Sequence, residues 1–380
     1  MRKPNALLRD ADGQIHVRQL CFFLAFLSPV SKLLQAPAML AYYAKGDLLL
    51  PAFIQYLLQG AMIFGLLFFS AKTQKSVFEL LREKVGVWAE KTALTVFSVY
   101  FVFFSLLPLL EMERFVYTAF FDTAPSPYSF IPFFFLSAYV CTKSLQAFAR
   151  CCDIALPFFV LSFLGLTAMS VGSADFSLLM PLFELPPKAV GLSVLRSFLH
   201  FSDTSLLLPM LGAYRYKKGD GKKIALAFSG GAFAVFVFLA IFYGTFGPLA
   251  VLKPYAFDKI AVYFSALEVV GRVDLLLVYM LTVLLLFYYC LPLQLCTRCF
   301  SDALGCKSKL PVAVGLNVGL FLLVVFFNRF YSAIYAVLTT KLIWIFPLFS
   351  YLIPLSCLLL IPKNGASVKK KEKKEQAYAQ

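Results

Sequence analysis

The stretch His200-Phe201-Ser202-Asp203-Thr204-Ser205 places five polar side chains among six residues of an otherwise apolar segment. Inside a bilayer such groups are costly unless they face the interior of the protein or a bound ligand. Ser, Thr and Asp side chains also compete for nearby backbone hydrogen bonds, which favours an unwound segment. The stretch therefore indicates an interrupted helix. A polar helix face packed against neighbouring helices is the alternative explanation.

A second stretch, Phe26-Leu27-Ser28-Pro29-Val30-Ser31-Lys32, interrupts the first apolar segment. Pro29 lacks an amide hydrogen and clashes with the preceding turn, so we expect the helix to bend or open there. Ser28 and Ser31 are able to satisfy the freed backbone groups or a ligand, and Lys32 places a charge within the segment. A simple proline kink, with Lys32 reaching the outer membrane interface, is also open.

The composition excludes a soluble enzyme. Hydrophobic residues make up 61% of the 380 residues, charged residues only 14%, and the mean hydropathy is +0.80. A soluble chain is about half apolar and a quarter charged. We therefore expect an all-α polytopic membrane protein of about ten transmembrane helices. The expected spans are 19–42, 49–70, 92–121, 127–145, 152–173, 190–212, 224–249, 273–296, 310–329 and 342–361.

Positive charge alternates between the two sides of these spans. Of the 35 Lys and Arg residues, 25 fall on the side of the N-terminus, 7 on the other side and 3 within spans. The positive-inside rule then predicts that both termini are cytoplasmic, and the net charge of +15 does not indicate nucleic acid. The first span is expected to be retained. Residues 1–362 are expected to form one transmembrane domain, and 363–380 a disordered basic tail suited to anionic lipid.

The two interrupted spans, the first and the sixth, are five spans apart. In an inverted five-plus-five repeat, about 19–173 and 190–361, they occupy equivalent positions. Paired interrupted helices of this kind indicate a binding site at the membrane midplane. The candidate ligand-binding residues are Ser28, Ser31, Lys32, Phe198, Phe201, Ser202, Asp203 and Ser205.

Four charged residues nearer the outer side are candidates for coupling or gating. Glu111, Glu113 and Arg114 lie toward the outer end of the third span. An internal Glu–Arg pair is one explanation, and Glu111 as a carboxylate linked to a proton or ligand is another. Glu268 lies in the outer loop 250–272, whose apolar spacing predicts a short helix on the outer face or a gate.

Motifs for other functions are missing. The sequence has no GxxxxGK[ST] phosphate loop, no GxGxxG, HExxH or GxSxG, and only two histidines. The nine cysteines lie mostly in spans or at their cytoplasmic ends, which does not predict a disulfide framework. Cys296-x-x-Cys299 alone is a weak metal signal. We expect no cofactor, no metal and no enzymatic activity.

Seven segments along the chain form a recognisable set of motifs. They are Arg18-Gln19-Leu20, Lys32 to Pro37, Glu113-Arg114-Phe115 through Pro125, Gln146 to Pro157, Leu178 to Pro181, Phe201-Ser202-Asp203 with Pro209, and Phe264 to Asp274. Together these motifs resemble the spore germination permease family, the B subunits of nutrient germinant receptors within the amino acid–polyamine–organocation superfamily. Where the family tends to have glycine in the first span, this chain has Ser31 and Lys32.

The resemblance implies a leucine-transporter-like fold with a ligand pocket between spans 1, 3, 6 and 8. It implies small nutrients such as amino acids as ligands, and two partners, a membrane-anchored A-type subunit and a lipoprotein C-type subunit. The expected location is the bacterial cell membrane or the spore inner membrane. A proton-coupled secondary amino-acid transporter of the same fold, with Lys32, Asp203 or Glu111 titrating, is the alternative. A membrane enzyme or scaffold would need a polar cluster that the sequence lacks.

Overall fold

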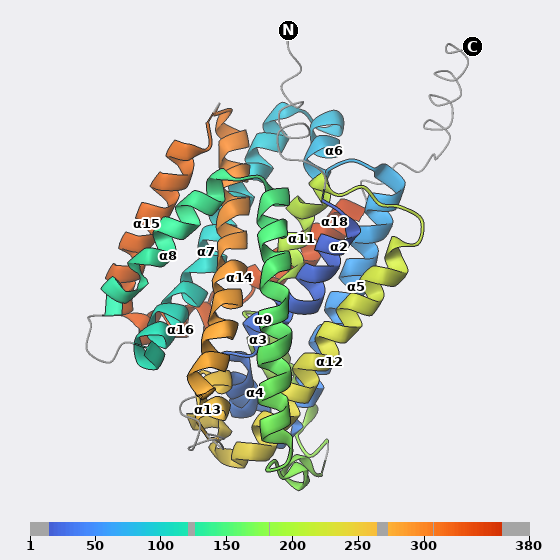
Figure 1. Ribbon diagram of the computed structural model, residues 1–380. Coiled ribbons are helices and arrows are strands. Elements are labelled where there is room, and N and C mark those ends of the chain that lie inside the picture. The colour runs from blue at the N-terminus through green and yellow to red at the C-terminus, as the bar shows by residue number, and fades with distance from the viewer. Residues whose placement is uncertain (1–14, 121–125, 182, 264–272, 307, 359–380) are drawn as a thin grey trace.

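The computed structural model describes residues 15–120, 126–181, 183–263, 273–306 and 308–358. Within these ranges the chain is helical, and the long helices run side by side as an elongated bundle (Figure 1). One isolated β-bridge between Ile15 and Tyr214 fastens the start of the first helix to the loop after α11. The expected all-α membrane class is confirmed.

The apolar segments form helices whose bounds follow the predicted spans closely. The helices of the first half are α2 (Val17–Phe22), α3 (Ser28–Lys32), α4 (Ala36–Ala44), α5 (Leu49–Thr73), α6 (Val77–Lys84), α7 (Val87–Phe120), α8 (Ser126–Thr142) and α9 (Leu145–Val171). Those of the second half are α10 (Pro187–Ser197), α11 (Thr204–Met210), α12 (Asp220–Phe246), α13 (Ala256–Tyr263), α14 (Val273–Leu304), α15 (Leu310–Asn328), α16 (Tyr331–Thr340), α17 (Ile345–Pro347) and α18 (Ile353–Leu358). Short 3₁₀ or π turns join several of them.

Six helices within the described ranges are long and apolar enough to cross a membrane on their own: α5, α7, α9, α12, α14 and α15. Two pairs of helices, each bent at a short break, would add two more spans if each pair crosses the membrane once. Val17–Lys32 and Ala36–Asp47 meet at 61°, and Tyr331–Thr340 and Ile345–Leu358 meet at 57°. Each of the ten expected spans contains at least one helix, but the number of membrane crossings and the inverted repeat stay predictions.

The last span begins earlier than expected. Residues 331–340, expected in an outer loop, form helix α16, and the chain turns before α17. The charges of Arg329 and Lys341 suggested a loop, but the residues from Tyr331 to Thr340 carry no charge and are apolar enough for a helix. Within 250–272, where a short helix was expected, residues Ala256–Tyr263 form α13, and its place on the outer face or in a gate stays a prediction. Residues 264–272 and the basic tail 363–380 lie outside the described residues.

The outer surface of the bundle is apolar, as a lipid-facing surface must be. The side chains of Phe135, Ile154 and Phe233 are 75%, 71% and 69% exposed. These residues lie on α8, α9 and α12, which all run along the outside of the bundle (Figure 1). In water such a surface would be an aggregation site, so the structure agrees with the sequence that this is an integral membrane protein.

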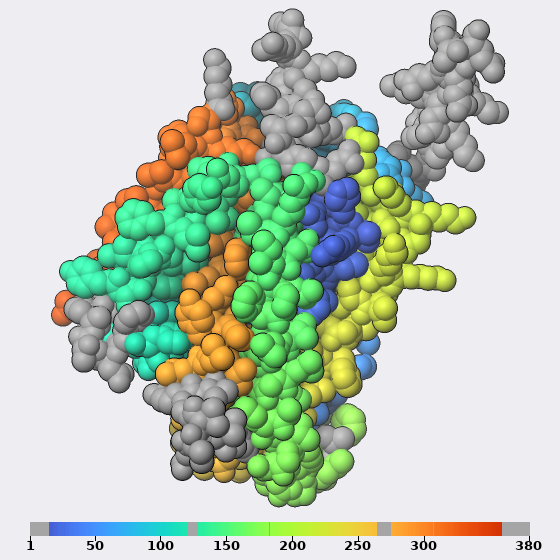
Figure 2. Space-filling view, in the orientation of Figure 1, coloured from blue at the N-terminus to red at the C-terminus, as the bar shows by residue number. Residues whose placement is uncertain are grey.

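Helix α12 approaches the first span very closely. A Cβ atom on Gly231 would lie 2.5 Å from the Leu24 carbonyl oxygen and 2.8 Å from Pro29 Cγ. Small residues permit such backbone contact between membrane helices. Figure 2 shows the first span at the surface in the seam between α9 and α12. Gly231 therefore fixes the position of the segment that carries Ser28 and Lys32.

Candidate functional site

The first span is interrupted one turn later than the sequence suggests. Pro29 was expected to be the point of bending, but the helix continues through it as α3 and ends at Lys32. A π-helical turn at Phe23–Leu27 precedes the proline, and the Ser28 amide donates to the Phe23 carbonyl. This wider turn accommodates the proline without opening the helix. The break lies instead at residues 33–35, before α4.

Helix α13 satisfies the backbone at this break. The amide of Ala256 donates to the Leu34 carbonyl at 2.8 Å, and the amide of Phe257 donates to the Leu33 carbonyl at 3.2 Å. The first amides of a helix lack partners within it, as do the last carbonyls of an interrupted one. The two ends therefore complete each other, and α13 is buried over the break, with Phe257 fully buried.

The sixth span is unwound where its polar residues cluster, as predicted. Helix α10 ends at Ser197, α11 begins at Thr204, and residues 198–203 between them are not helical. Side chains take over some of the hydrogen bonding, because the Ser202 hydroxyl donates to the Phe198 carbonyl and the Ser205 hydroxyl to the Ser202 carbonyl. As the sequence indicated, serine side chains here compete with the main chain for hydrogen bonds.

Two amides on α5 support the same break from the side. Gln55 donates through Nε2 to the Val194 carbonyl at 2.7 Å and to the Ser197 hydroxyl at 2.9 Å. Gln59 donates to the Phe201 carbonyl at 2.5 Å. Neither glutamine was predicted from the sequence, although two amides four residues apart in an apolar span were a usable signal.

Lys32 and Asp203 meet where the two interrupted spans approach each other. The Lys32 ammonium group forms an ion pair with Asp203 Oδ2, and their side chains are 0% and 5% exposed. The ammonium also donates to the Ser28 carbonyl at 2.9 Å and to the Ser28 hydroxyl at 3.0 Å. It lies 5.3 Å from the centre of the Phe201 ring. Lys32 therefore points inward, and the alternative in which it reaches the interface is wrong.

The carboxylate of Asp203 has two further donors. The Ser28 hydroxyl donates to Oδ2 at 2.6 Å, and the Tyr288 hydroxyl donates to Oδ1. A buried charge pair is tolerated only when its remaining hydrogen-bonding capacity is filled. Tyr288, on α14, completes this requirement, and no feature of the sequence distinguishes it among 19 tyrosines.

A second layer of polar contacts lies beside the pair. The Tyr100 hydroxyl on α7 donates to the Ser205 hydroxyl at 3.0 Å, and the Tyr100 ring stacks on Phe349 at 4.0 Å. The Ser350 hydroxyl donates to the Ser202 carbonyl at 2.9 Å. Spans 3, 6, 8 and 10 thus all contribute to the region around the two breaks.

The remaining predicted ligand residues are placed differently. The Ser31 hydroxyl donates to the Ser28 carbonyl at 2.8 Å, within its own helix. The Phe198 ring is half-buried and lies edge-on to Tyr351 at 5.5 Å. Ser28, Lys32, Phe201 and Asp203 therefore form the centre of the candidate site, and Ser31 and Phe198 lie at its margin.

The charged residues of the third span form a separate group. Asn328 joins Glu113 and Arg114, because its amide donates to Glu113 at 3.0 Å and its side-chain oxygen accepts from Arg114 at 3.0 Å. The Arg114 guanidinium also lies over the Tyr331 ring. Glu111, on the same helix, is also buried, at 2% exposed. Glu268 lies outside the described residues.

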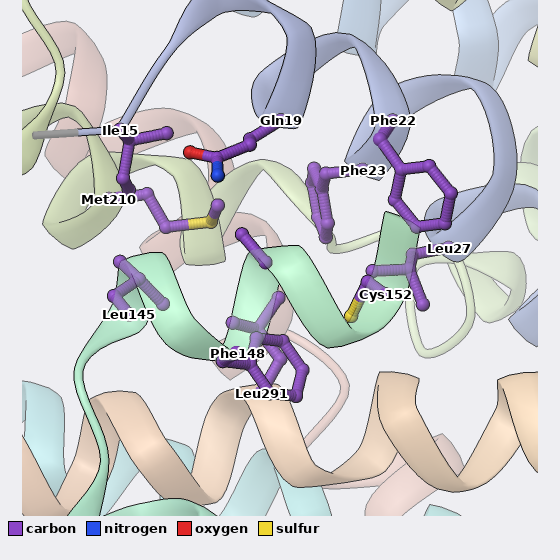
Figure 3. Close-up of a pocket in the computed structure, with 11 residues that line it drawn as sticks. Ile15, Gln19, Phe22, Phe23, Leu27, Leu145, Phe148, Cys152, Met210 and Leu291 are labelled. Carbon is purple, nitrogen blue, oxygen red and sulfur yellow. The ribbon is translucent and has the colours of Figure 1, made fainter. Parts of the chain in front are cut away.

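A small cavity lies between α2, α9 and α14, beside the start of the first span. Its volume is about 20 Å³, the room of about one water molecule. Gln19 is the only amide side chain among the lining residues, and it faces Met210 and Leu145 across the cavity (Figure 3). Neither Lys32 nor Asp203 lines it. The Lys32 and Asp203 side chains are themselves 0% and 5% exposed, so the charged site is closed to solvent, and a ligand requires the helices to separate before it can enter.

In the ranges that the structure describes, no three His, Cys, Asp or Glu side chains gather in a way that would hold a metal ion. The positive charge nearest to the Asp203 carboxylate is the chain's own, on Lys32. The arrangement offers one fixed cation and one fixed anion, with hydroxyl groups on either side.

More than half of the chain matches a known family. Residues 47–337 match the family model for spore germination proteins, Spore_permease. None of the curated proteins compared with the chain matches it.

Two solved structures share the fold. MhsT, in complex with L-phenylalanine, superposes with a TM-score of 0.59 over 92% of this chain and 98% of its own, at 12% identity. A Na⁺-coupled sialic acid symporter in a substrate-bound, outward-open state gives a TM-score of 0.55 over 87% of this chain and 78% of its own, at 11% identity. These likenesses confirm the expected leucine-transporter-like fold.

Proposed function

The chain belongs to the spore germination protein family of membrane permeases, and on that premise we propose that it is the membrane subunit of a nutrient-germinant receptor. It binds a small nutrient such as an amino acid between the interrupted spans 1 and 6. The observation that carries the proposal is the buried Lys32–Asp203 pair at the two breaks. The same fold holds L-phenylalanine in MhsT.

The chemistry of the pair suits a ligand with both charges. An ammonium and a carboxylate buried together cost several kcal/mol of desolvation, which their mutual attraction offsets. A zwitterion replaces this contact by two, with its carboxylate on Lys32 and its ammonium group on Asp203 and the Tyr288 hydroxyl. When such a ligand binds, its two charged groups replace the Lys32–Asp203 contact, and no charge is left uncompensated. A neutral sugar or an apolar ligand lacks the charges for this exchange.

Ligand binding must separate a pair of segments that are bonded to other helices. The break in span 1 is capped by α13, and the break in span 6 is held by α5. A ligand that fits only when the Lys32–Asp203 contact opens has different affinities for the closed and opened states. That difference is what shifts the equilibrium between them. In the receptor the shift passes to A-type and C-type partner subunits in the spore inner membrane, with both termini of this chain in the cytoplasm.

The alternative function is a secondary amino-acid transporter coupled to protons. It is favoured by the fold, which a Na⁺-coupled symporter shares. In that case Lys32 and Asp203 carry the coupling charge, and the ligand crosses the membrane after the helices rearrange.

Uptake by the isolated chain distinguishes the two. The chain is reconstituted in proteoliposomes, and accumulation of a radiolabelled L-amino-acid mixture is measured with and without a proton gradient. The receptor function predicts no accumulation, together with thermal stabilisation of the protein by the same mixture. Gradient-dependent accumulation would establish the transporter instead, and absence of both uptake and stabilisation would contradict both functions.

The partner subunits are tested separately. Co-expression with A-type and C-type subunits, followed by capture of a tag on this chain, should recover all three from detergent extracts. Recovery of this chain alone would contradict its place in a receptor complex.

A further inference from the structure

The connection between α11 and α12 exposes a dense group of positive charges. Between residues 215 and 223 every basic side chain is exposed, and these are Arg215, Lys217, Lys218, Lys222 and Lys223. In the part of the chain that the structure describes, none of them forms an ion pair with an acidic side chain. Like charges held this close repel one another, so the surface favours an anionic partner.

The acidic residue of this connection does not reduce the exposed charge. Asp220 is buried, and its Oδ2 atom accepts from the Tyr214 hydroxyl at 2.6 Å and from the Lys217 amide at 3.1 Å. Both contacts lie within the connection and the first turn of α12. The carboxylate therefore shapes the connection from the inside and leaves the basic side chains on the outside.

The backbone of the connection is fixed to two other spans. The Gln74 side-chain amide, after α5, donates to the Tyr216 carbonyl at 3.1 Å. The Ile15 main-chain amide, before α2, donates to the Ala213 carbonyl at 2.9 Å. The connection lies at the same end of the bundle as α6 (Figure 1). The charges are therefore held in place at the end that the charge distribution predicts to be cytoplasmic.

Helix α12 places these charges next to a lipid-facing surface. Leu226 and Phe233 are 77% and 69% exposed, and they follow Lys222 by four and eleven residues. Residues at these spacings share one face of a helix, because a turn contains 3.6 residues. Since the apolar side chains of this face contact acyl chains, Lys222 lies one turn away, at the level of the lipid headgroups.

We propose that the basic connection 215–223 binds the headgroup of an anionic phospholipid, whose acyl chains lie along Leu226 and Phe233. A cluster of four to eight basic residues beside a membrane span is the pattern that anionic headgroups recognise. An acidic segment of a partner protein would match the charges but not the apolar face that continues from them. The lipid matches both.

Binding at this place stabilises the arrangement around the closed site without contact to its charges. Helix α11 begins directly after Asp203, and α12 packs against the first span at Gly231. A lipid that holds the connection between these two helices favours the folded arrangement, so it raises the melting temperature.

The test is a titration of phosphatidylglycerol into the purified full chain in neutral detergent micelles that contain phosphatidylcholine, with the melting temperature as the readout. Phosphatidylglycerol is expected to raise the melting temperature of the wild type, and inorganic phosphate is not. Each basic residue near an anionic surface contributes about a fivefold gain in affinity. Removing four is therefore expected to lower the apparent lipid affinity by on the order of several hundredfold, in the loop variant Lys217→Gln/Lys218→Gln/Lys222→Gln/Lys223→Gln.

Two control variants separate the connection from net charge. The first removes four exposed basic residues that the order of the spans places at the other end of the bundle, and it should keep the wild-type lipid affinity: Lys45→Gln/Lys188→Gln/Arg329→Gln/Lys341→Gln. The second replaces the four lysines of the loop variant by arginine. It keeps their charge and should also bind as the wild type does.

Equal melting temperatures of the wild type with and without phosphatidylglycerol would overturn the lipid site, as would equal lipid affinities of the loop variant and the first control. A shift with inorganic phosphate as large as that with the lipid would also overturn it, because the acyl chains would then play no part. If the loop variant does not fold, a wild-type lipid affinity that is unchanged at high salt contradicts the site.

A protein partner would give a different result. Loss of the A-type and C-type subunits from the capture experiment in the loop variant, with unchanged lipid affinity, would assign the connection to a partner protein and overturn the lipid site. The lipid titration contains no amino acid, so its outcome is independent of the proposed function.

Discussion

The ammonium group of Lys32 and the carboxylate of Asp203 form a buried ion pair although 171 positions separate them in the sequence. Each lies beside a break in its own span. The pair therefore joins the two interrupted helices at the place where the regular helical hydrogen bonding of both is broken. The proposed ligand site depends on that contact.

Removing one charge of the pair should cost more than removing both. Lys32→Met and Asp203→Asn each leave an uncompensated buried charge, which costs about 3–5 kcal/mol. The double variant leaves none, so its melting temperature in detergent is expected to exceed that of either single variant. If the double variant instead melts lower than the wild type by the sum of the two single losses, the two side chains do not interact.

Tyr288 and Tyr56 give a matched comparison of two buried phenols. Tyr288→Phe removes a hydroxyl that donates to a carboxylate, a loss of about 1.5–3 kcal/mol. The Tyr56 hydroxyl is buried and has no hydrogen-bond partner among the residues that the structure describes, so Tyr56→Phe is expected to change stability by no more than about 0.5 kcal/mol. Chemical denaturation in mixed micelles measures both. Equal effects of the two substitutions would remove Tyr288 from the support of Asp203.

Two adjacent glycines on α12 are expected to differ sharply. A Cβ atom at Gly231 would meet the Leu24 carbonyl oxygen at 2.5 Å, whereas one at Gly230 meets nothing within 4 Å. Gly231→Ala should therefore lower stability by about 1–3 kcal/mol or more through overpacking. Gly230→Ala should be neutral or stabilise the helix by up to about 1 kcal/mol. Melting curves of the two variants decide, and equal curves would refute the close approach of α12 to the first span.

Gln59 is expected to hold the unwound segment of span 6 in place. Gln59→Leu leaves the Phe201 carbonyl without the donor that now lies at 2.5 Å, at a cost of about 1–3 kcal/mol. Hydrogen exchange should become faster in the peptide that covers residues 198–203, and unchanged in α15, which lies elsewhere in the bundle. Unchanged exchange in residues 198–203 would mean that the break does not depend on α5.

The sequence was sufficient for the fold class and for the position of one break. In span 6 the polar side chains themselves replace backbone hydrogen bonds. Residues 200–205 therefore contain the cause of the break, and the sequence alone predicts it. In span 1 the expected break at Pro29 was wrong. A π-helical turn absorbs the proline, and the true break at 33–35 is stabilised by α13, more than 200 positions away.

The centre of the site was accessible from sequence because a charge within an apolar span is rare. Lys32 and Asp203 stood out for that reason. Tyr288 and Ser350 could not be chosen, since Tyr and Ser occur throughout the apolar spans and only packing shows which of them face Asp203 or the broken helix. Asn328, which joins Glu113 to Arg114, was hidden in the same way.

Ligand-induced thermal stabilisation tests the central claim most directly. The melting temperature of the purified chain is measured with and without a mixture of L-amino acids, for the wild type, Tyr56→Phe and Asp203→Asn. We expect an upward shift of the melting temperature in the wild type and in Tyr56→Phe, as binding to the folded state requires, and a much smaller shift or none in Asp203→Asn. A shift in Asp203→Asn equal to that of the wild type would contradict a ligand site at the Lys32–Asp203 pair.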